Sequence, residues 1–215
     1  MTHPPTLGVI LAGGLARRMG GGDKGLRLVG GERLLDRLVR RMAPQVAGLA
    51  VNANDDPARF ADLGLPVVPD SVADRPGPLA GVIAGMDWAA SHPSGAAWIV
   101  TVPGDCPFVP LDLVARLHGG RGTADLACAA SGGWTHPVVG LWPLSIRDAL
   151  RQAVRDGVRK MDAFTGRYAT AAVEWPVEDV DPFFNVNTPD DLREADRLAR
   201  EELPPSPSPS GRGPG

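Results

Sequence analysis

The chain has 215 residues, a nearly balanced net charge of −3 and 43% hydrophobic residues. This length suits one domain with a sizeable core, and the apolar content excludes a chain that is disordered throughout. The charge shows no basic excess, so a nucleic-acid partner is not indicated. Cys106 and Cys128 do not have a disulfide-framework spacing, and neither an apolar leader nor an 18-residue apolar run is present. We expect a soluble, cytoplasmic protein with no membrane contact.

Short β-rich runs alternate with helical patterns over residues 1–202. Strands are predicted at Leu7–Leu11, Leu49–Asn52, Pro66–Val68, Ala97–Val102, Leu126–Ala129, Val138–Leu141 and Ala171–Glu174. Helices are predicted at Arg33–Met42, Pro57–Leu63, Leu79–Ser91, Leu111–Leu117, Ile146–Asp156, Lys160–Thr165 and Pro189–Glu202, the last with Thr188 as its N-cap. Such alternation favours an α/β fold with a mostly parallel sheet. The Pro, Ser and Gly tail at 203–215 offers nothing to a core, and we expect it to be disordered.

The first predicted strand leads into a glycine-rich loop at residues 11–24, which also carries Arg17, Arg18 and Lys24. Glycines let backbone N–H groups approach phosphate oxygens, and the cations neutralise polyphosphate charge. The loop lacks the Lys-Ser/Thr pair of a Walker motif and the glycine spacing of a dinucleotide fingerprint. It therefore predicts a different kind of nucleoside triphosphate site, with a basic surface loop as the alternative.

A second loop, Pro103–Pro107, follows the most apolar central strand and contains Asp105. The prolines and the glycine fix a turn, which holds Asp105 at the same sheet edge as the glycine-rich loop. Mg²⁺ uses one or two carboxylates and completes its shell with phosphate oxygens and water. We predict that Asp105 binds Mg²⁺; the alternative is an aspartate that only stabilises its own turn.

Other polar residues stand at strand or helix ends. Asn52 and Asp70 are candidates for the base or ribose, because a carboxylate accepts the adjacent N–H groups of guanine; plain turn chemistry is the alternative for both. The loop Arg75–Gly81 enters a helix whose first N–H groups could meet an anion, or it is only a connection. Candidates for a second substrate are His136, Arg159, Lys160, Asn185 and Asn187, each with a structural alternative such as a solvated or helix-start residue.

No Ser/His/Asp set and no Cys/His zinc spacing is evident in the sequence, and Cys106 is interpreted as a packed residue rather than a nucleophile. Chemistry by positioning and charge neutralisation remains, which is what phosphoryl and nucleotidyl transfer require.

Taken in order, these residues resemble the bacterial molybdenum cofactor guanylyltransferases, within the nucleotidyltransferase superfamily. The resemblance covers about residues 7–200 and is carried by the segments Leu11–Gly14, Arg17–Gly20, Asp23–Gly25, Val51–Asn54, Asp70–Ser71, Pro76–Gly81, Pro103–Pro107, His136–Pro137 and Asn185–Pro189. It departs from the family at the three glycines 20–22, and Gly157–Phe164 is similar to the family's arginine-bearing segment only loosely.

The resemblance implies a Rossmann-like three-layer sandwich that binds GTP and Mg²⁺ and transfers GMP to the terminal phosphate of molybdopterin, with release of pyrophosphate. It also implies that Leu11, Ala12, Gly13, Gly14, Lys24, Asn52, Asp70 and Asp105 contact GTP. Asp105, Lys24 and Arg18 would be the catalytic residues, and cofactor-biosynthesis or delivery proteins are further expected partners.

Three other functions fit parts of the same pattern. A cytidylyltransferase for the same pterin and a sugar-phosphate nucleotidyltransferase would keep the fold and the mechanism. A nucleotide-binding cofactor-delivery protein without turnover is the alternative from another class, against which the position of Asp105 in its rigid turn argues.

Overall fold

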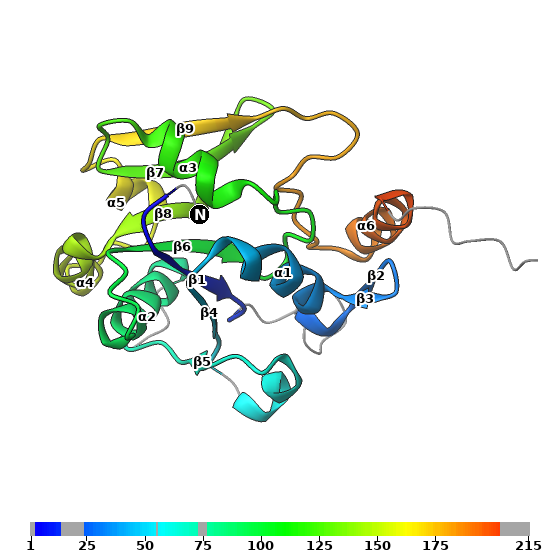
Figure 1. Ribbon diagram of the computed structural model, residues 1–215, viewed down its shortest axis with the longest axis horizontal. Helices are drawn as coiled ribbons and strands as arrows, with labels where there is room; N and C mark the ends of the chain where they lie inside the picture. The colour runs from blue at the N-terminus through cyan, green and yellow to red at the C-terminus, as the bar shows by residue number, and fades with distance from the viewer. Residues whose placement is uncertain (1–2, 14–23, 55, 73–76, 203–215) are drawn as a thin grey trace, which may run out of the picture.

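The computed structural model describes residues 3–13, 24–54, 56–72 and 77–202. Its centre is a seven-stranded sheet with the order β5-β4-β1-β6-β8-β7-β9 (Figure 1). The strands are β1 (Thr6–Leu11), β4 (Gly48–Asn52), β5 (Val67–Val68), β6 (Trp98–Pro103), β7 (Leu126–Ser131), β8 (Trp134–Pro143) and β9 (Thr170–Trp175). Each of them overlaps a strand predicted from the sequence.

The sheet is mostly parallel, as predicted. Strand β1 pairs in parallel with β4 and β6, β4 with β5, and β7 with β9, whereas β8 runs antiparallel to both β6 and β7. Strand β8 runs antiparallel to β7 because only two residues, Gly132 and Gly133, connect the two strands. Their φ angles of 56° and 82° fit a tight hairpin turn, a backbone conformation that residues with side chains rarely adopt. As a result β8 begins at Trp134, earlier than the predicted Val138–Leu141, and its first residues reach the carboxyl end of β6.

The described residues contain six α-helices: α1 (Leu34–Met42), α2 (Pro78–Ser91), α3 (Leu113–Arg121), α4 (Arg147–Arg155), α5 (Met161–Thr165) and α6 (Pro189–Glu202). Short 3₁₀ helices add η2 (Lys24–Leu26), η3 (Ala43–Gln45), η4 (Pro57–Leu63) and η5 (Leu144–Ile146). The segment Pro57–Leu63, predicted as a helix, thus forms the tighter 3₁₀ type. Among these helices none is both long and apolar enough to cross a membrane.

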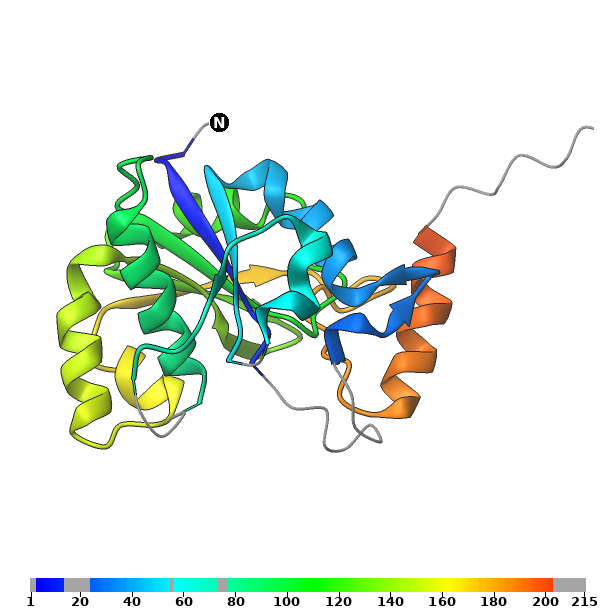
Figure 2. The same cartoon turned by 90° about the horizontal axis from the view of Figure 1, so that it is seen from below.

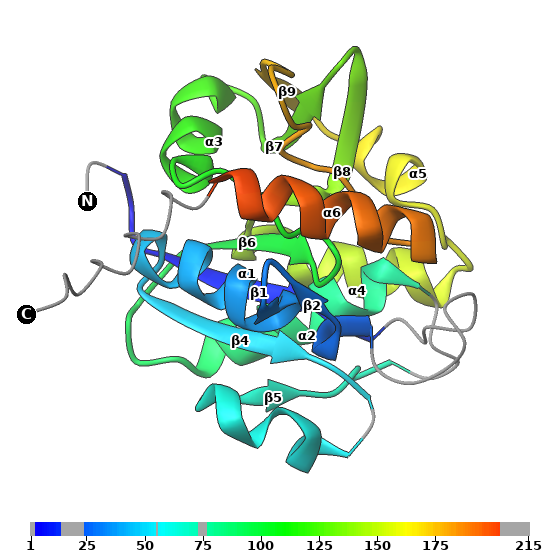
Figure 3. The same cartoon turned by 90° about the vertical axis from the view of Figure 1, so that its right-hand side faces the viewer.

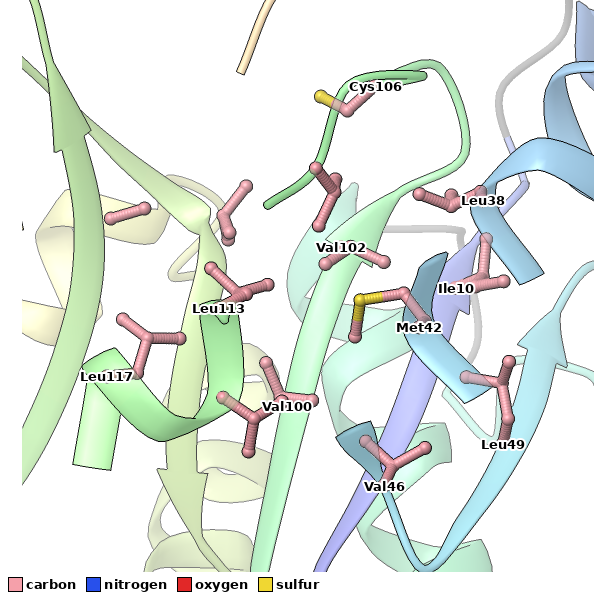
Figure 4. Close-up of a cluster of buried hydrophobic side chains, with 14 of the residues drawn as sticks. Ile10, Leu38, Met42, Val46, Leu49, Val100, Val102, Cys106, Leu113 and Leu117 are labelled. Atoms are coloured by element: carbon pink, nitrogen blue, oxygen red, sulfur yellow. The ribbon is translucent and has the colours of Figure 1, made fainter. Parts of the chain in front are cut away.

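Two apolar clusters lie on opposite faces of the sheet. On one face, Leu38 and Met42 of α1 and Leu113 and Leu117 of α3 pack against Ile10 and neighbouring strand residues (Figure 4). On the other face the cluster combines residues of β1, α2, α4 and α5, including Leu7, Val9, Leu79, Ile83, Leu150 and Phe164. The predicted three-layer α/β sandwich is therefore confirmed.

Two glycines on the inward side of helix α2 let it pack closely against the sheet. A Cβ on Gly85 would come within 2.7 Å of Cγ2 of Val9. One turn earlier, a Cβ on Gly81 would meet Oδ1 of Asn52 and lie 2.8 Å from Cδ2 of Leu11. The start of α2 is thereby placed against the ends of β1 and β4.

The last helix packs away from the main sheet, beside a small hairpin of β2 (Leu28–Val29) and β3 (Glu32–Arg33) (Figure 2). Its predicted cap is confirmed, since the backbone N–H of Asp191 donates to Oγ1 of Thr188 (3.1 Å). Asp191 reciprocates by accepting from the backbone N–H of Thr188 (2.8 Å), which completes a capping box. Figure 3 shows α6 on the near side of the molecule, in front of the main sheet and above α1.

Candidate active site

A cavity of about 490 Å³ opens where β1, β4 and β6 end and β8 begins. Its walls are formed by Leu11, Gly13, Asn52, Asn54, Asp70, Gly77, Pro78, Gly81, Pro103, Asp105, Cys106, Thr135, His136, Pro137, Val138, Val139, Phe183 and Asn185. Ligands of open α/β sheets bind at this edge, outside the carboxyl ends of the strands. The cavity therefore lies where the sequence predicts a site.

The loops that leave β1 and β6 are joined through their backbones. The N–H of Gly104 donates to the carbonyl of Leu11 (2.9 Å), and the N–H of Ala12 donates to the carbonyl of Asn52 (2.8 Å). A Cβ on Gly104 would lie 3.3 Å from Cα of Ala12, so a side chain there would crowd the contact. Leu11 and Gly13 reach the cavity in this way. Gly14, Arg17 and Arg18 lie outside the described residues, and Lys24 starts η2 on the far side of that gap.

Asn52, Asn54 and Asp70 form one hydrogen-bonded group on the β4–β5 side of the cavity. Nδ2 of Asn52 donates to one carboxylate oxygen of Asp70 (3.0 Å), and Nδ2 of Asn54 donates to the other (2.7 Å). The backbone N–H of Asp70 donates to Oδ1 of Asn54 (2.8 Å). The structure thus brings Asn52 and Asp70 together as the sequence suggests, and adds Asn54, whose role the sequence analysis missed although it stands two residues after Asn52.

Asp105 is half-buried and lines the cavity just after β6, which lies between β1 and β8 in the sheet. Its backbone carbonyl accepts from the N–H of Val186 (2.9 Å), which joins the turn to the segment before α6. The neighbouring Cys106 is only 1% exposed, and its thiol donates to Oδ1 of Asn185 (3.3 Å). The interpretation of Cys106 as a packed residue is confirmed.

Basic and amide side chains from α1 and η3 hold the chain that follows Asp105. Arg37, Arg41 and Gln45 each donate to a backbone carbonyl within residues 107–110, at 3.1, 2.6 and 2.8 Å. Their four-residue spacing places the three side chains along one side of the helical stretch. Arg37 is 3% exposed and also forms an ion pair with Glu202 at the end of α6. The carboxylate turn is therefore fixed from both sides.

The predicted second-substrate residues divide into two groups. His136 and Asn185 line the cavity. Arg159 instead donates to the carbonyl of Val154 at the end of α4 (2.7 Å), although its own backbone runs close to Gly77 at the cavity edge. Lys160 precedes α5 and Asn187 precedes α6, where the backbone N–H of Asn187 donates to Asp191 (2.8 Å). These last three residues are not among the described lining, and their predicted role stays a prediction.

His136 is anchored at the back of the cavity. Its Nε2 lies 2.7 Å from Oγ of Ser131, and its ring is 5.0 Å from that of Phe183. Burial lowers the pKa of His136, against the opposing effect of the carboxylates of Asp181 and Glu174. Thr135 was not predicted as a lining residue because the start of β8 was placed too late, and Phe183 was not predicted because it lies in the segment between β9 and α6, which carries no sequence signal for the cavity.

The cavity is lined by two carboxylates, those of Asp70 and Asp105, together with amides, glycines, His136 and apolar side chains, and such a lining at the edge of an α/β sheet suits a nucleotide with a divalent cation. A family model described as the MobA-like NTP transferase domain matches residues 8–171. A curated relative from Rhodopseudomonas palustris (strain BisB5), named molybdenum cofactor guanylyltransferase, is 58% identical over 92% of this chain and 95% of its own length. The chain therefore belongs to the molybdenum cofactor guanylyltransferase family of MobA-like NTP transferases, and it is a nucleotidyltransferase.

Solved structures support the same fold. Molybdopterin-guanine dinucleotide biosynthesis protein A from Archaeoglobus fulgidus has a TM-score of 0.68 at 23% identity, over 91% of this chain and 99% of its own. A Mycobacterium tuberculosis protein, solved in complex with manganese, has a TM-score of 0.63 at 18% identity, over 90% and 98% of the two chains.

Proposed function

We propose that this protein transfers GMP from GTP to the terminal phosphate of molybdopterin, forming the guanine dinucleotide form of the cofactor and releasing pyrophosphate. The name of the 58% identical relative supports this assignment. The observation that carries it is the order of the strands along the cavity. Asn52, Asn54 and Asp70 stand at the ends of β4 and β5, His136 belongs to β8, and Asp105 follows β6, which lies between them in the sheet. A nucleotidyl donor and its acceptor need this arrangement, because they must meet at one phosphorus atom.

The residues that would bind the nucleotide lie mainly at the ends of β1 and β4. Leu11, Ala12, Gly13 and Gly14 line GTP with their backbones, and Asn52 and Asp70 contact its nucleoside. Asp70 already accepts from Asn52 and Asn54, and each carboxylate oxygen keeps a second lone pair for a guanine N–H. The two amides thus orient the carboxylate toward the base.

Asp105 is the proposed ligand of a divalent cation, which we take to be Mg²⁺. The donor set fits, since one carboxylate is what Mg²⁺ takes from a protein when substrate phosphates and water complete its shell. When bound, the cation would neutralise charge on the α-phosphate and on the departing pyrophosphate. Lys24 and Arg18, from the glycine-rich loop, bind the phosphates and stabilise the charge that develops on the leaving group.

In the reaction an oxygen of the acceptor phosphate attacks the α-phosphorus of GTP. The new P–O bond forms as the bond between the α-phosphorus and the bridging oxygen breaks, and pyrophosphate carries the electron pair away. A phosphate monoester is largely ionised at neutral pH, with a second pKa of about 6, so no strong general base is required. The residues act by holding donor and acceptor in line.

The test is pyrophosphate release by the full chain with molybdopterin and Mg²⁺, comparing GTP with CTP, ATP and UTP. Pterin-dependent release with GTP alone is the expected result. Release with CTP would select the cytidylyltransferase, release that requires a sugar phosphate would select the other rival, and nucleotide binding without release would favour a delivery protein. Asp105→Asn should abolish release, whereas the control Asp148→Asn, whose side chain is 85% exposed on α4, should not.

Supply of guanylated cofactor to molybdenum enzymes in the cytoplasm completes the proposal. Contacts with cofactor-biosynthesis or delivery proteins stay a prediction from the resemblance.

A further inference from the structure

The acceptor side of the cavity has a wall of its own, made by a distortion of β8. Pairing between β7 and β8 jumps from Cys128–Gly140 to Ala129–His136, so residues 137–139 of β8 bulge out of the ladder. All three of these residues line the cavity, together with Phe183. The bulge therefore presents a mainly apolar surface beside His136.

This wall is pinned from behind. Oγ1 of Thr101, which is fully buried, donates to the carbonyl of Val138 (2.7 Å) and accepts from Nε1 of Trp142 (2.9 Å). A Cβ on Gly140 would come within 2.7 Å of that indole nitrogen, so glycine leaves room for the ring. These contacts stabilise the bulged conformation of β8.

Hydrogen-bond direction then fixes the tautomer of His136. Oγ of Ser131 lies 2.8 Å from Oδ1 of Asp181, and the backbone N–H of Phe183 donates to the same oxygen (2.9 Å). An ionised carboxylate only accepts, so the single hydroxyl proton of Ser131 goes to Asp181. Oγ must then accept from His136, which places the ring proton on Nε2 and leaves Nδ1 as an acceptor.

The other polar atom of the ring remains available. In the part of the chain that the structure describes, no hydrogen bond to Nδ1 of His136 is found. Burial keeps the pKa of this imidazole below its ordinary value, which favours the neutral ring. A neutral Nδ1 accepts hydrogen bonds and offers nothing to a phosphate oxygen.

We infer that the bulged wall of β8 binds the flat heterocycle of the acceptor, with Nδ1 of His136 accepting a hydrogen bond from a ring N–H and with Ser131 and Asp181 as positioning residues. This inference rests on the proposed function for the identity of the acceptor. It assigns His136 to the pterin ring and excludes it from binding the acceptor's phosphate. Recognition of an N–H donor by a fixed acceptor also rejects heterocycles that lack the donor, because the buried acceptor would be left unpaired.

The first experiment determines the tautomer by ¹⁵N NMR of the full chain at pH 7.5, without any reaction. The imidazole resonances of His136 are assigned by their loss in His136→Gln. We expect a proton on Nε2 only, a mixture of tautomers in Ser131→Ala, and the parental spectrum in Asp181→Asn, whose amide oxygen can replace Oδ1. Free pterin should shift the Nδ1 resonance, and inorganic phosphate should not. A proton on Nδ1, or a response to phosphate alone, would overturn the inference.

The second experiment measures transfer kinetics with a matched pair of variants. His136→Asn places an amide oxygen near the position of Nδ1, whereas His136→Gln reaches Ser131 but lacks an acceptor at Nδ1. His136→Gln and Ser131→Ala should raise the KM for the acceptor about 3- to 10-fold, the range for one neutral hydrogen bond, with the KM for GTP unchanged. His136→Asn should recover part of the loss. An unchanged acceptor KM in His136→Gln would refute the subsite, whereas absence of transfer in the parent protein would refute the proposed function and leave the NMR result standing.

Discussion

A methyl group added at Gly81 tests how closely the nucleotide site depends on the packing of α2. The Cβ of alanine would press on Oδ1 of Asn52 and on the side chain of Leu11, both of which line the cavity. Gly85 provides the matched control, because its Cβ would lie 2.7 Å from Val9, close to the 2.8 Å that separates a Cβ at Gly81 from Leu11, and Val9 is not among the residues that line the cavity. Both substitutions are glycine to alanine, in the same helix, facing the same sheet.

The energetics can be separated from the function. Overpacking costs about 1–3 kcal/mol, and alanine recovers about 1 kcal/mol of helix propensity over glycine, so each variant should lose about 0–2 kcal/mol of folding free energy. Only Gly81→Ala displaces Asn52, whose amide holds the carboxylate of Asp70. A loss of about 1.4 kcal/mol in nucleotide binding is tenfold, and we expect the KM for GTP to rise about 5- to 10-fold.

Urea denaturation gives the first quantity and pyrophosphate release at varied GTP gives the second. Equal GTP affinities in the two variants would show that α2 does not transmit packing to the nucleotide site. A raised KM in Gly85→Ala alone would also contradict the reasoning.

Three further predictions concern other parts of the molecule. Arg37→Met removes the hydrogen bond to the carbonyl of Pro107 and the ion pair with Glu202, and it should lower the free energy of unfolding in urea by about 2–3 kcal/mol. Arg40→Met, on the exposed side of α1, should lower it by under about 1 kcal/mol. Equal losses in the two variants would contradict the role of Arg37 in holding the turn that carries Asp105. Thr188→Ala should destabilise α6 by about 1 kcal/mol while Thr188→Ser stays near the parent, and a null effect of the alanine would deny the cap its role. Burial, with His3 and Arg121 nearby, lowers the pKa of His118 to about 4. As the pH falls, the unfolded chain therefore binds a proton at this imidazole before the folded protein does. The free energy of unfolding should fall by about 1–2 kcal/mol between about pH 6.5 and about pH 4, after allowance for solvent screening. In His118→Gln that part of the pH slope should disappear, and an unchanged slope would assign it to other groups.

The sheet could be predicted from the sequence because each of its strands combines an apolar run with turn residues at its ends. The two β-hairpins were harder to predict from the sequence than the strands of the sheet. Gly30-Gly31 joins β2 to β3 and Gly132-Gly133 joins β7 to β8, each pair with two positive φ angles. A Gly-Gly pair between β-rich residues is a hairpin signal, but β2 and β3 are only two residues long and the second pair lies beside polar residues. Reading the second signal would have placed His136 within β8.

The candidate site could be predicted only at the strand ends. Asn52 is the last residue of β4 and Asp105 comes two residues after the end of β6, so their shared edge follows from the topology alone. The pairing of Asn54 with Asp70, and the contact of Ser131 with Asp181, join residues 16 and 50 positions apart and depend on the packed loops. Arg159 was predicted to contact a second substrate, but its side chain donates to the carbonyl of Val154 at the end of α4. No spacing in the sequence indicates that contact.

The antiparallel course of β8 has a consequence for how such an enzyme changes over time. In the proposed site the wall that would meet the acceptor belongs largely to the β7–β8 hairpin, whereas the wall that would meet the nucleotide belongs to the ends of β1 and β4. Insertions or substitutions in the hairpin can therefore alter which molecule receives the nucleotide while the choice of nucleotide stays intact. In the proposed site, specificity for the nucleotide and specificity for the acceptor can therefore evolve independently, and the turn that carries Asp105 is the part that both share.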